Sequence, residues 1–334
     1  MDFDQRSQRS QVARLRPLAR QALAAYPLEV TGLRLLHHGF NTTFRVDTVQ
    51  GERYALRLNV NSRRTRGQIG AEMAWLAALA RDTDLVLPVP QPRRDGALFG
   101  QVWSEDLGRE LPAALFSWLP GRNLGDRATP AQLRAVGQAA ATLHAHARRW
   151  SLPPGTGLIA LDTPLMDSPN TLAAEHPLLT PECREVIGLV WTRVTDTLGR
   201  LFQADTPRPL HADLHAWNLK WHRGQLAVFD FDDSGIGVPV QDLAIAAYYL
   251  RPRAELEEAL LSGYAGVAAL PPCSPPDFES LIAGRNLVLL NDLFSTTTAE
   301  IRALLPRYLP NTVTKLRHFL ESGTYRHDLP GLLE

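Results

Sequence analysis

The sequence predicts an α+β protein with two lobes, a small N-terminal lobe of strands and helices and a larger, mostly helical C-terminal lobe. The length of 334 residues suits about two domains. Residues 42–58 carry two alternating runs typical of strands, whereas apolar residues recur at helical spacing through most of the second half. A Leu-Pro-Gly break at residues 119–121 separates these regions. We therefore place residues 1–118 in the first lobe and residues 119–334 in the second.

The N-terminal lobe is expected to contain two helices and a small sheet. Phe44, Val46 and Thr48 lie on one face of residues 42–49, and the alternation in residues 53–58 predicts a second strand. The intervening Gln-Gly pair favours a hairpin turn. The other expected elements are helices at residues 8–25 and 67–80, strands at 33–36, 97–103 and 113–118, and a proline-interrupted extended segment at 85–91.

The C-terminal lobe is expected to be helical apart from one hairpin. Thr129 and Pro130 supply an N-cap and a suitable first helical residue, so a helix is predicted to begin there. Residues 219–222 and 226–229 predict two short strands around a turn. The expected helices cover residues 130–148, 181–202, 240–250, 254–266, 278–294 and 298–322, the last with breaks at Pro306 and Pro310. A cleft between two such lobes is a natural ligand site.

Composition and charge argue against several classes of partner. The 35 basic and 35 acidic residues cancel, which removes the bulk electrostatic attraction to nucleic acid or to an anionic membrane. No run of 18 apolar residues is present, so no transmembrane helix is expected. The two cysteines, Cys183 and Cys273, do not form a disulfide framework. We expect a cytoplasmic protein without a nucleic-acid or membrane partner.

The residues with the clearest chemistry lie in the segment HADLHAWNLKWHRGQLAVFDFDDSG, residues 211–235. Asp213 is followed five residues later by Asn218, and a turn and an apolar strand then lead to Asp230. Phosphoryl transfer needs a carboxylate that orients and deprotonates the attacking hydroxyl, and an amide oxygen and a second carboxylate that hold Mg²⁺. A hairpin would return Asp230 toward the other two residues. The array therefore predicts a phosphoryl-transfer site.

HADLHAWN followed by VFDFDD resembles the aminoglycoside phosphotransferase and choline kinase superfamily. That group shares the protein-kinase-like fold and includes homoserine kinase and bacterial stress-response kinases. The resemblance implies an enzyme that uses ATP and Mg²⁺, with Asp213 as catalytic base and Asn218 and Asp230 as magnesium ligands. It also implies that Asp242 is a structural carboxylate, tying the next helix to the catalytic loop. Ala212 stands where the family usually has glycine.

The N-terminal lobe extends the resemblance. GFNTTFRV, residues 39–46, is similar to the family's turn over the nucleotide phosphates, which implies nucleotide contacts for Asn41 and Thr42. The first 219 residues contain no lysine, so Arg57 must serve where kinases carry a strand lysine, and Glu72, fifteen residues later, matches its partner acid. The hinge whose backbone meets adenine is expected at Ser117, Trp118 and Leu119.

The expected activity is transfer of the γ-phosphoryl group of ATP to a hydroxyl of a small molecule. An amino alcohol, a hydroxy amino acid and an aminoglycoside-like compound are all candidate acceptors. A serine or threonine on a protein is an alternative, by analogy with the stress-response kinases. Arg285 could bind an acceptor carboxylate, although a surface or helix-dipole arginine is the preferred interpretation. Oligomeric state stays open.

Other classes of function are also considered. His211, Asp213 and His215 form H-x-D-x-H, which could ligate zinc in a hydrolase if further ligands came from elsewhere. We interpret His211 instead as packing the loop, and His144 and His146 as structural. The Asp-Phe-Asp-Asp run is also compatible with a phosphatase of the haloacid-dehalogenase type, but it lies too far along the chain. A catalytically inactive nucleotide-binding scaffold is disfavoured because all three catalytic positions are present.

Overall fold

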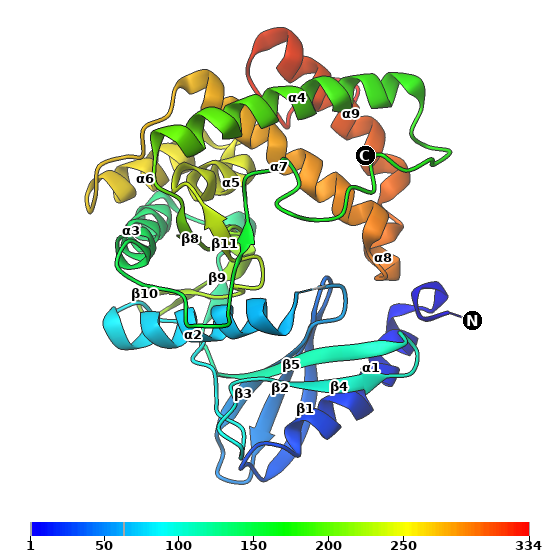
Figure 1. Cartoon of the computed structure of the whole chain (residues 1–334), viewed down its shortest axis with the longest axis vertical. Helices are drawn as coiled ribbons and strands as arrows, with labels where there is room; N and C mark the ends of the chain where they lie inside the picture. Colours follow the sequence, from blue (N-terminus) through cyan, green and yellow to red (C-terminus); the bar gives the residue numbers. More distant parts are fainter. Residues whose placement is uncertain (1, 63, 334) are drawn as a thin grey trace.

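A five-stranded antiparallel sheet forms the centre of the N-terminal lobe in the computed structural model, which describes residues 2–62 and 64–333 (Figure 1). Its strands, in spatial order, are β1 (Val30–His38), β2 (Thr42–Thr48), β3 (Arg53–Leu58), β5 (Arg109–Ser117) and β4 (Gly100–Ser104). The hairpin predicted over residues 42–58 is confirmed. The strand predicted at residues 113–118 begins earlier, because the polar residues Arg109 and Glu110 pair with β4 at the sheet edge.

One helix covers each face of this sheet. Helix α1 (Gln8–Leu23) packs against the face that carries Phe44 and Leu56. Helix α2 (Arg66–Asp82) lies on the other face with Phe116, between the sheet and the C-terminal lobe (Figure 1). Thr65 begins α2 with a capping box, in which its hydroxyl and the Gln68 side chain satisfy backbone N–H groups.

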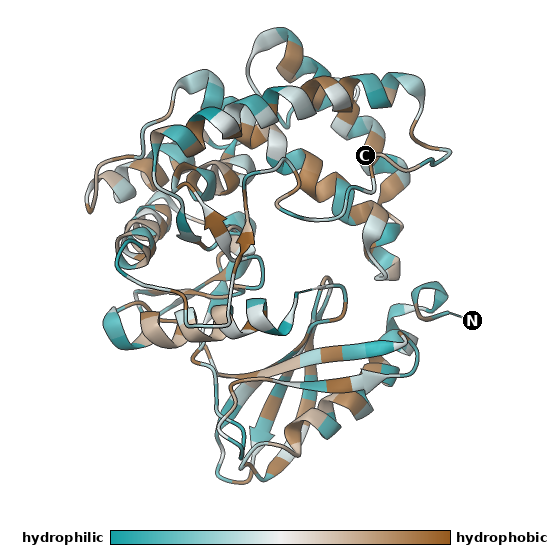
Figure 2. Ribbon diagram, viewed as in Figure 1, coloured by the Kyte–Doolittle hydropathy of each residue, from teal (hydrophilic) through white to brown (hydrophobic). Residues whose placement is uncertain are grey.

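The C-terminal lobe is a bundle of helices. They are α3 (Pro130–Ala147), α4 (Pro181–Ala204), α5 (Val240–Leu250), α6 (Ala254–Ala265), α7 (Pro275–Ser295), α8 (Ala299–Arg302) and α9 (Leu305–Ser322). Thr129, Thr180 and Ser274 each cap a helix that begins with proline, the pattern that predicts a helix start. Hydrophilic and hydrophobic residues are interspersed along α4, as expected for a helix with one buried face (Figure 2).

The last predicted helix needs a correction. The chain breaks between α8 and α9 at residues 303–304, ahead of both prolines. Pro306 lies in the first turn of α9, where a missing N–H costs nothing, and Pro310 remains inside the helix. Pro306 therefore marks the start of α9, and Pro310 does not interrupt the helix.

Two small sheets connect the helices, where one hairpin was expected. The expected hairpin, β9 (Leu219–His222) and β10 (Gln225–Val228), is joined by β6 (Arg122–Asn123). A second sheet consists of β7 (Ile159–Ala160), β11 (Gly235–Gly237) and β8 (Arg208–Leu210). Short 3-10 helices are η1 (Phe3–Gln5), η2 (Gly125–Arg127) and η3 (Ala216–Asn218). Strands of two or three residues, some containing glycine, show no alternating pattern that would reveal them in sequence.

The lobes are in contact at several places, among them the direct connection of the chain and the turn that follows α7. Strand β5 ends at Ser117 and β6 begins at Arg122, so residues 118–121 connect the lobes directly. On the other side, the turn between α7 and α8 reaches the N-terminal lobe (Figure 1). There the Asn61 side chain accepts from the Thr297 amide at 2.8 Å, and Thr298 Oγ1 donates to the Gly39 carbonyl at 2.5 Å. Within the described residues, no helix is long and apolar enough to cross a membrane.

Candidate active site

The catalytic loop is held by a buried carboxylate at the start of α5. Asp242 accepts hydrogen bonds from the backbone N–H groups of His211 at 3.1 Å and Ala212 at 2.6 Å. Its Oδ2 also lies 3.0 Å from His144 Nε2. Ala212 has a φ of 64°, so the turn uses the left-handed region in which glycine is more usual. The structural role expected for Asp242 therefore matches the contacts that it makes.

Asp213, the expected catalytic residue, lies in this loop with both carboxylate oxygens engaged. Oδ2 accepts from Asn218 Nδ2 at 2.7 Å and lies 3.2 Å from His215 Nε2, while Oδ1 accepts from Arg285 Nη2. Burial opposes ionisation, but the charges of His215 and Arg285 hold the pKa of Asp213 well below its ordinary value. The side chain keeps 15% of its surface exposed, so it remains accessible to a substrate.

Asp230 is in the opposite electrostatic condition. It ends the apolar run after β10 with a φ of 65°, and its side chain is 40% exposed. Burial raises the pKa of Asp230 to about 8, and the nearby carboxylates of Asp232 and Asp213 add to this, against the opposing charge of Arg57. A carboxylate crowded by other carboxylates attracts a cation.

Asn218 and Asp230 form a donor set that suits Mg²⁺. The side-chain amide of Asn218 donates to Asp213, and among the described residues none donates a hydrogen bond to its side-chain oxygen, Oδ1. Mg²⁺ is typically bound by one or two protein oxygens with water and substrate phosphates completing the octahedron. In keeping with this, the described residues contain no group of three or more His, Cys, Asp or Glu side chains that could hold a metal by itself.

Arg57 and Glu72 form the ion pair that the family resemblance implies. The guanidinium of Arg57, on β3, donates to both carboxylate oxygens of Glu72, on α2, at 2.8 and 2.7 Å. Arg57 is 6% exposed and Glu72 is 3% exposed. Arg57 Nη1 also lies 3.8 Å from Asp230 Oδ1, so this pair borders the candidate metal site. A contact between Arg57 and nucleotide phosphates stays a prediction.

Asp232 joins the loop expected over the nucleotide phosphates, residues 39–46, to the segment of the candidate metal ligand Asp230. It accepts from Asn41 Nδ2 at 2.9 Å and from Asn59 Nδ2 at 2.7 Å, both in the N-terminal lobe. Thr42, by contrast, is fully buried and bonds to His38 at 2.7 Å, so its side chain is committed to the N-terminal lobe. The structure thus brings Asn41 to the site and does not bring the Thr42 hydroxyl there.

The expected hinge carries an unforeseen partner. Ser117 bonds through its backbone and hydroxyl to Val89, at 2.9 Å in each case. The carbonyl of Leu119 accepts from Lys220 Nζ at 3.0 Å, and this ammonium lies 4.9 Å from the centre of the Trp118 ring. Sequence reasoning missed Lys220, although it is one of only two lysines and follows Asn218 by two residues.

Helix α7 supplies two further charged side chains that sequence reasoning did not place. Arg285 is 6% exposed and contacts Asp213, so the preferred interpretation as a surface arginine is wrong. Asp292, seven residues later and on the same face of the helix, is half-buried. Burial raises the pKa of Asp292 to about 7, with Asp233 adding to the effect. The seven-residue spacing of Arg285 and Asp292, which places both on one face of the helix, was the sequence signal that could have grouped them.

The zinc interpretation finds no geometric support. His211 Nε2 faces the Phe229 carbonyl at 3.0 Å, and its Nδ1 accepts from the Asp213 amide at 3.2 Å, so both ring nitrogens are occupied. His144 and His146 are buried and bonded to Asp242 and Asp82. The structural roles expected for these histidines agree with these contacts.

Comparison with known proteins decides the family. A model of the phosphotransferase enzyme family matches residues 32–275, which span both lobes, the catalytic loop and Asp230. The chain belongs to this family. The phosphotransferase fold expected from the catalytic motif, with a sheet-based N-terminal lobe and a helical C-terminal lobe, is confirmed. No curated protein sequence matches this phosphotransferase significantly.

Solved structures share the whole architecture of the phosphotransferase. A microcompartment-associated aminopropanol kinase is 24% identical with a TM-score of 0.70, over 93% of this chain and 99% of its own. The amicoumacin kinase hAmiN, in complex with AMP-PNP, Ca²⁺ and Ami, is 19% identical with a TM-score of 0.70, over 92% and 96%. A choline/ethanolamine kinase family protein from Mesorhizobium loti is 18% identical with a TM-score of 0.63, over 92% and 95%.

Proposed function

We propose that this phosphotransferase moves the γ-phosphoryl group of ATP to a hydroxyl of a small, amine-bearing molecule. The observation that carries the proposal is the convergence of Asp213, Asn218 and Asp230 on one side of the cleft, beside the Arg57–Glu72 pair from the other lobe. In a member of the phosphotransferase family, these are the groups that in-line transfer to an alcohol requires.

The chain's own residues divide the work of the reaction. Asp213 accepts a hydrogen bond from the acceptor hydroxyl and aims its oxygen at the γ-phosphorus. As the new O–P bond forms and the bond to the ADP oxygen breaks, the hydroxyl proton passes to the Asp213 carboxylate. Arg57 places a fixed positive charge near the phosphates. Asn218 and Asp230 would hold Mg²⁺, which supplies charge neutralisation for the transferred group.

The surroundings of Asp213 are better suited to a cationic acceptor than to an anionic one. Asp292 forms no ion pair with any described residue, and Asp233 forms only a long one, at 3.6 Å to Arg64. The opposing charge of Arg285 is already engaged by Asp213. Two of the similar structures are named as kinases of aminopropanol and of amicoumacin, which agrees with an amine-bearing acceptor.

A ³¹P NMR screen of hydroxyl acceptors tests the proposal. The protein, ATP and Mg²⁺ are incubated with amino alcohols, with homoserine, choline and aminoglycosides, and with neutral alcohols matched in carbon skeleton. We expect a phosphomonoester signal with an amine-bearing acceptor and none after chelation of the metal. The phosphomonoester should form at least about tenfold faster with this acceptor than with its neutral counterpart. A phosphomonoester formed only on serine or threonine of an added protein would contradict the small-molecule acceptor.

A further inference from the structure

Arg285 contacts the catalytic carboxylate from the side opposite Asn218. Its Nη2 donates both to Asp213 Oδ1 and to Tyr249 Oη, the latter at 3.0 Å. Asn218 and His215 engage the other oxygen of Asp213. The carboxylate is therefore held at both ends and cannot rotate without breaking a charge-assisted hydrogen bond.

Tyr249, on α5, is the platform for this arrangement. The Arg285 guanidinium lies 5.7 Å from the centre of the Tyr249 ring, and the His215 ring lies 4.6 Å from it. Arg285 and His215, which contact different oxygens of Asp213, thus both pack on one aromatic ring. We call Arg285, Tyr249 and His215 the Asp213 bracket.

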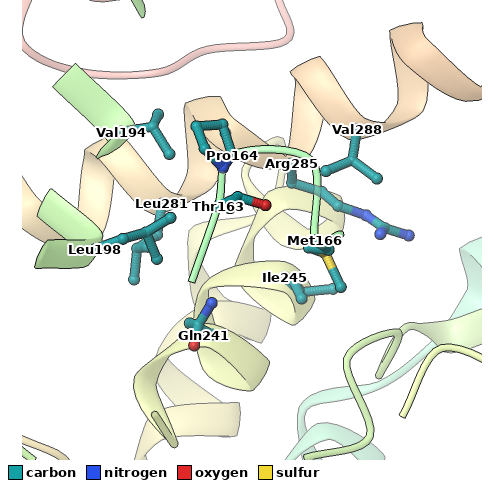
Figure 3. A pocket seen from close by; sticks show the side chains of 11 residues that line it. Thr163, Pro164, Met166, Val194, Leu198, Gln241, Ile245, Leu281, Arg285 and Val288 are labelled. Carbon is teal, nitrogen blue, oxygen red and sulfur yellow. The ribbon is translucent and has the colours of Figure 1, made fainter. Parts of the chain in front are cut away.

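Stability alone does not explain the bracket. Arg285 Nε is buried and has no hydrogen-bond partner in the described structure. The stem of Arg285 lines a small cavity of about 30 Å³ with apolar residues such as Leu281 and Val288, and its guanidinium points away from that cavity (Figure 3). A buried ion pair adds little net stability, and an unsatisfied N–H reduces it. Arg251 Nε is likewise buried without a hydrogen-bond partner in the described structure, so the inference rests on the contact of Arg285 with Asp213.

We propose that Arg285 is a positioning residue for phosphoryl transfer, which together with Tyr249 fixes the Asp213 carboxylate in the orientation that meets the acceptor hydroxyl. The inference rests on the proposed function, because that function gives Asp213 its role. Correct placement of the reacting groups is worth a large part of a catalysed rate. Removing Arg285 therefore lowers kcat and leaves nucleotide binding unchanged.

Three variants and one matched control test this role. Arg285→Met removes the charge and keeps the stem, Arg285→Lys keeps the charge, and Tyr249→Phe removes only the hydroxyl. Arg251→Met is the control, because Arg251 is also a largely buried arginine of the C-terminal lobe, paired with Glu257 and Glu279. For each protein, kcat, both KM values, ATP affinity by calorimetry and Tm are measured.

We expect Arg285→Met to lose at least about tenfold in kcat, the effect of removing one charge-assisted hydrogen bond, with the KM for ATP within about twofold of wild type. Arg285→Lys recovers part of the loss, and Tyr249→Phe shows a smaller loss. Arg251→Met keeps kcat within about twofold even if its Tm falls. Should Arg285→Met fail to fold, the lysine and phenylalanine variants decide, since a kcat equal to wild type in both would overturn the role.

The results that would contradict the inference distinguish a failure of the positioning role from a failure of the proposed function. If the wild-type enzyme is active and Arg285→Met has the same kcat, the positioning role is wrong and the proposed function stands. If Arg251→Met loses as much kcat as Arg285→Met, the effect is one of general stability and the role is also wrong. If the wild-type enzyme transfers phosphate to none of the acceptors, the proposed function fails and this inference fails with it.

Discussion

Asp213 and Asp230 show how the partners of a carboxylate set its role. Burial opposes ionisation of both, yet the charges of His215 and Arg285 hold the pKa of Asp213 well below its ordinary value, whereas burial, with Asp232 and Asp213 adding to it, raises the pKa of Asp230 to about 8. Environments that shift the pKa values of two acids in opposite directions typically indicate that the two acids have different roles. The protein's own side chains stabilise the ionised form of Asp213, whereas the ionised form of Asp230 is suited to binding a cation.

Asp230→Ala and Asn218→Ala should therefore change the response to magnesium. We expect ATP binding by Asp230→Ala to lose its Mg²⁺ dependence and turnover to fall at least about a hundredfold, because a metal-bound carboxylate is removed. Asn218→Ala should show the same defect more weakly, since a neutral amide contributes less charge. Calorimetric ATP titrations over a range of Mg²⁺ concentrations measure this. Unchanged magnesium dependence in both variants would refute the ligand assignment.

Arg57 and Glu72 should act as a pair. Arg57→Ala is expected to lower kcat/KM at least about tenfold, and Arg57→Lys should restore part of this, because charge returns without the bidentate geometry. Glu72→Gln should give a smaller defect. The double variant should lose less than the sum of the two, since both residues share one interaction. Strictly additive losses would show that the two residues act independently.

At the residue scale, sequence separation decided what could be predicted. Arg57 and Glu72 lie on consecutive elements, β3 and α2, and the family resemblance implied their pairing. Arg285 meets Asp213 across 72 residues of sequence, and only the tertiary fold reveals that contact. The alternation sets Thr42 on the same face as Phe44, which is the core face, so the burial of its side chain could be predicted, whereas a nucleotide contact of Thr42 stays a prediction.

At the scale of elements, capped helices were predictable and short strands were not. The Thr-Pro and Ser-Pro starts fix α3, α4 and α7 by local hydrogen bonding. Strands β7 and β11 exist only because distant segments lie side by side, so nothing local encodes them. The proline signal in α9 was misinterpreted, because proline inside a helical pattern can mark a first turn.

The start of α5 should be the element end most sensitive to a single change. Asp242→Asn is expected to reduce the free energy of unfolding by about 1.5–3 kcal/mol, because a buried carboxylate accepting two backbone N–H bonds is replaced by an amide. Activity should fall with it, since those bonds shape the catalytic loop. Glu255→Gln, an exposed acid in the first turn of α6, is the control and should change stability by less than about 0.5 kcal/mol. Chemical denaturation measures both, and equal effects would contradict the assignment.

At the scale of the whole molecule, the lobes are tied across the cleft by Asp232. Asp232 lies two residues beyond Asp230, and its buried carboxylate accepts hydrogen bonds from Asn41 and Asn59 of the N-terminal lobe. Any opening of the cleft on that side must break these bonds. The tie therefore couples the loop expected over the phosphates to the candidate metal site.

Asp232→Ala should weaken the contact between the two lobes. We expect a larger radius of gyration in solution scattering and a kcat/KM for ATP reduced at least about tenfold, because two hydrogen bonds to a charged acceptor are lost. Asp328→Ala is a suitable control, since that carboxylate is exposed and, among the described residues, forms an ion pair with Arg326 alone. Scattering and kinetics equal to wild type in Asp232→Ala would show that closure does not depend on the tie.

The central claim is that Asp213 directs phosphoryl transfer from ATP to a hydroxyl acceptor. The most direct test compares wild type with Asp213→Asn by ³¹P NMR, using the best acceptor from the screen and saturating ATP and Mg²⁺. We expect a phosphomonoester and ADP from wild type, a rate lower by about 10²–10⁴ in Asp213→Asn, and unchanged ATP affinity by calorimetry. Phosphomonoester formation at the wild-type rate by a cleanly purified Asp213→Asn protein would contradict the account.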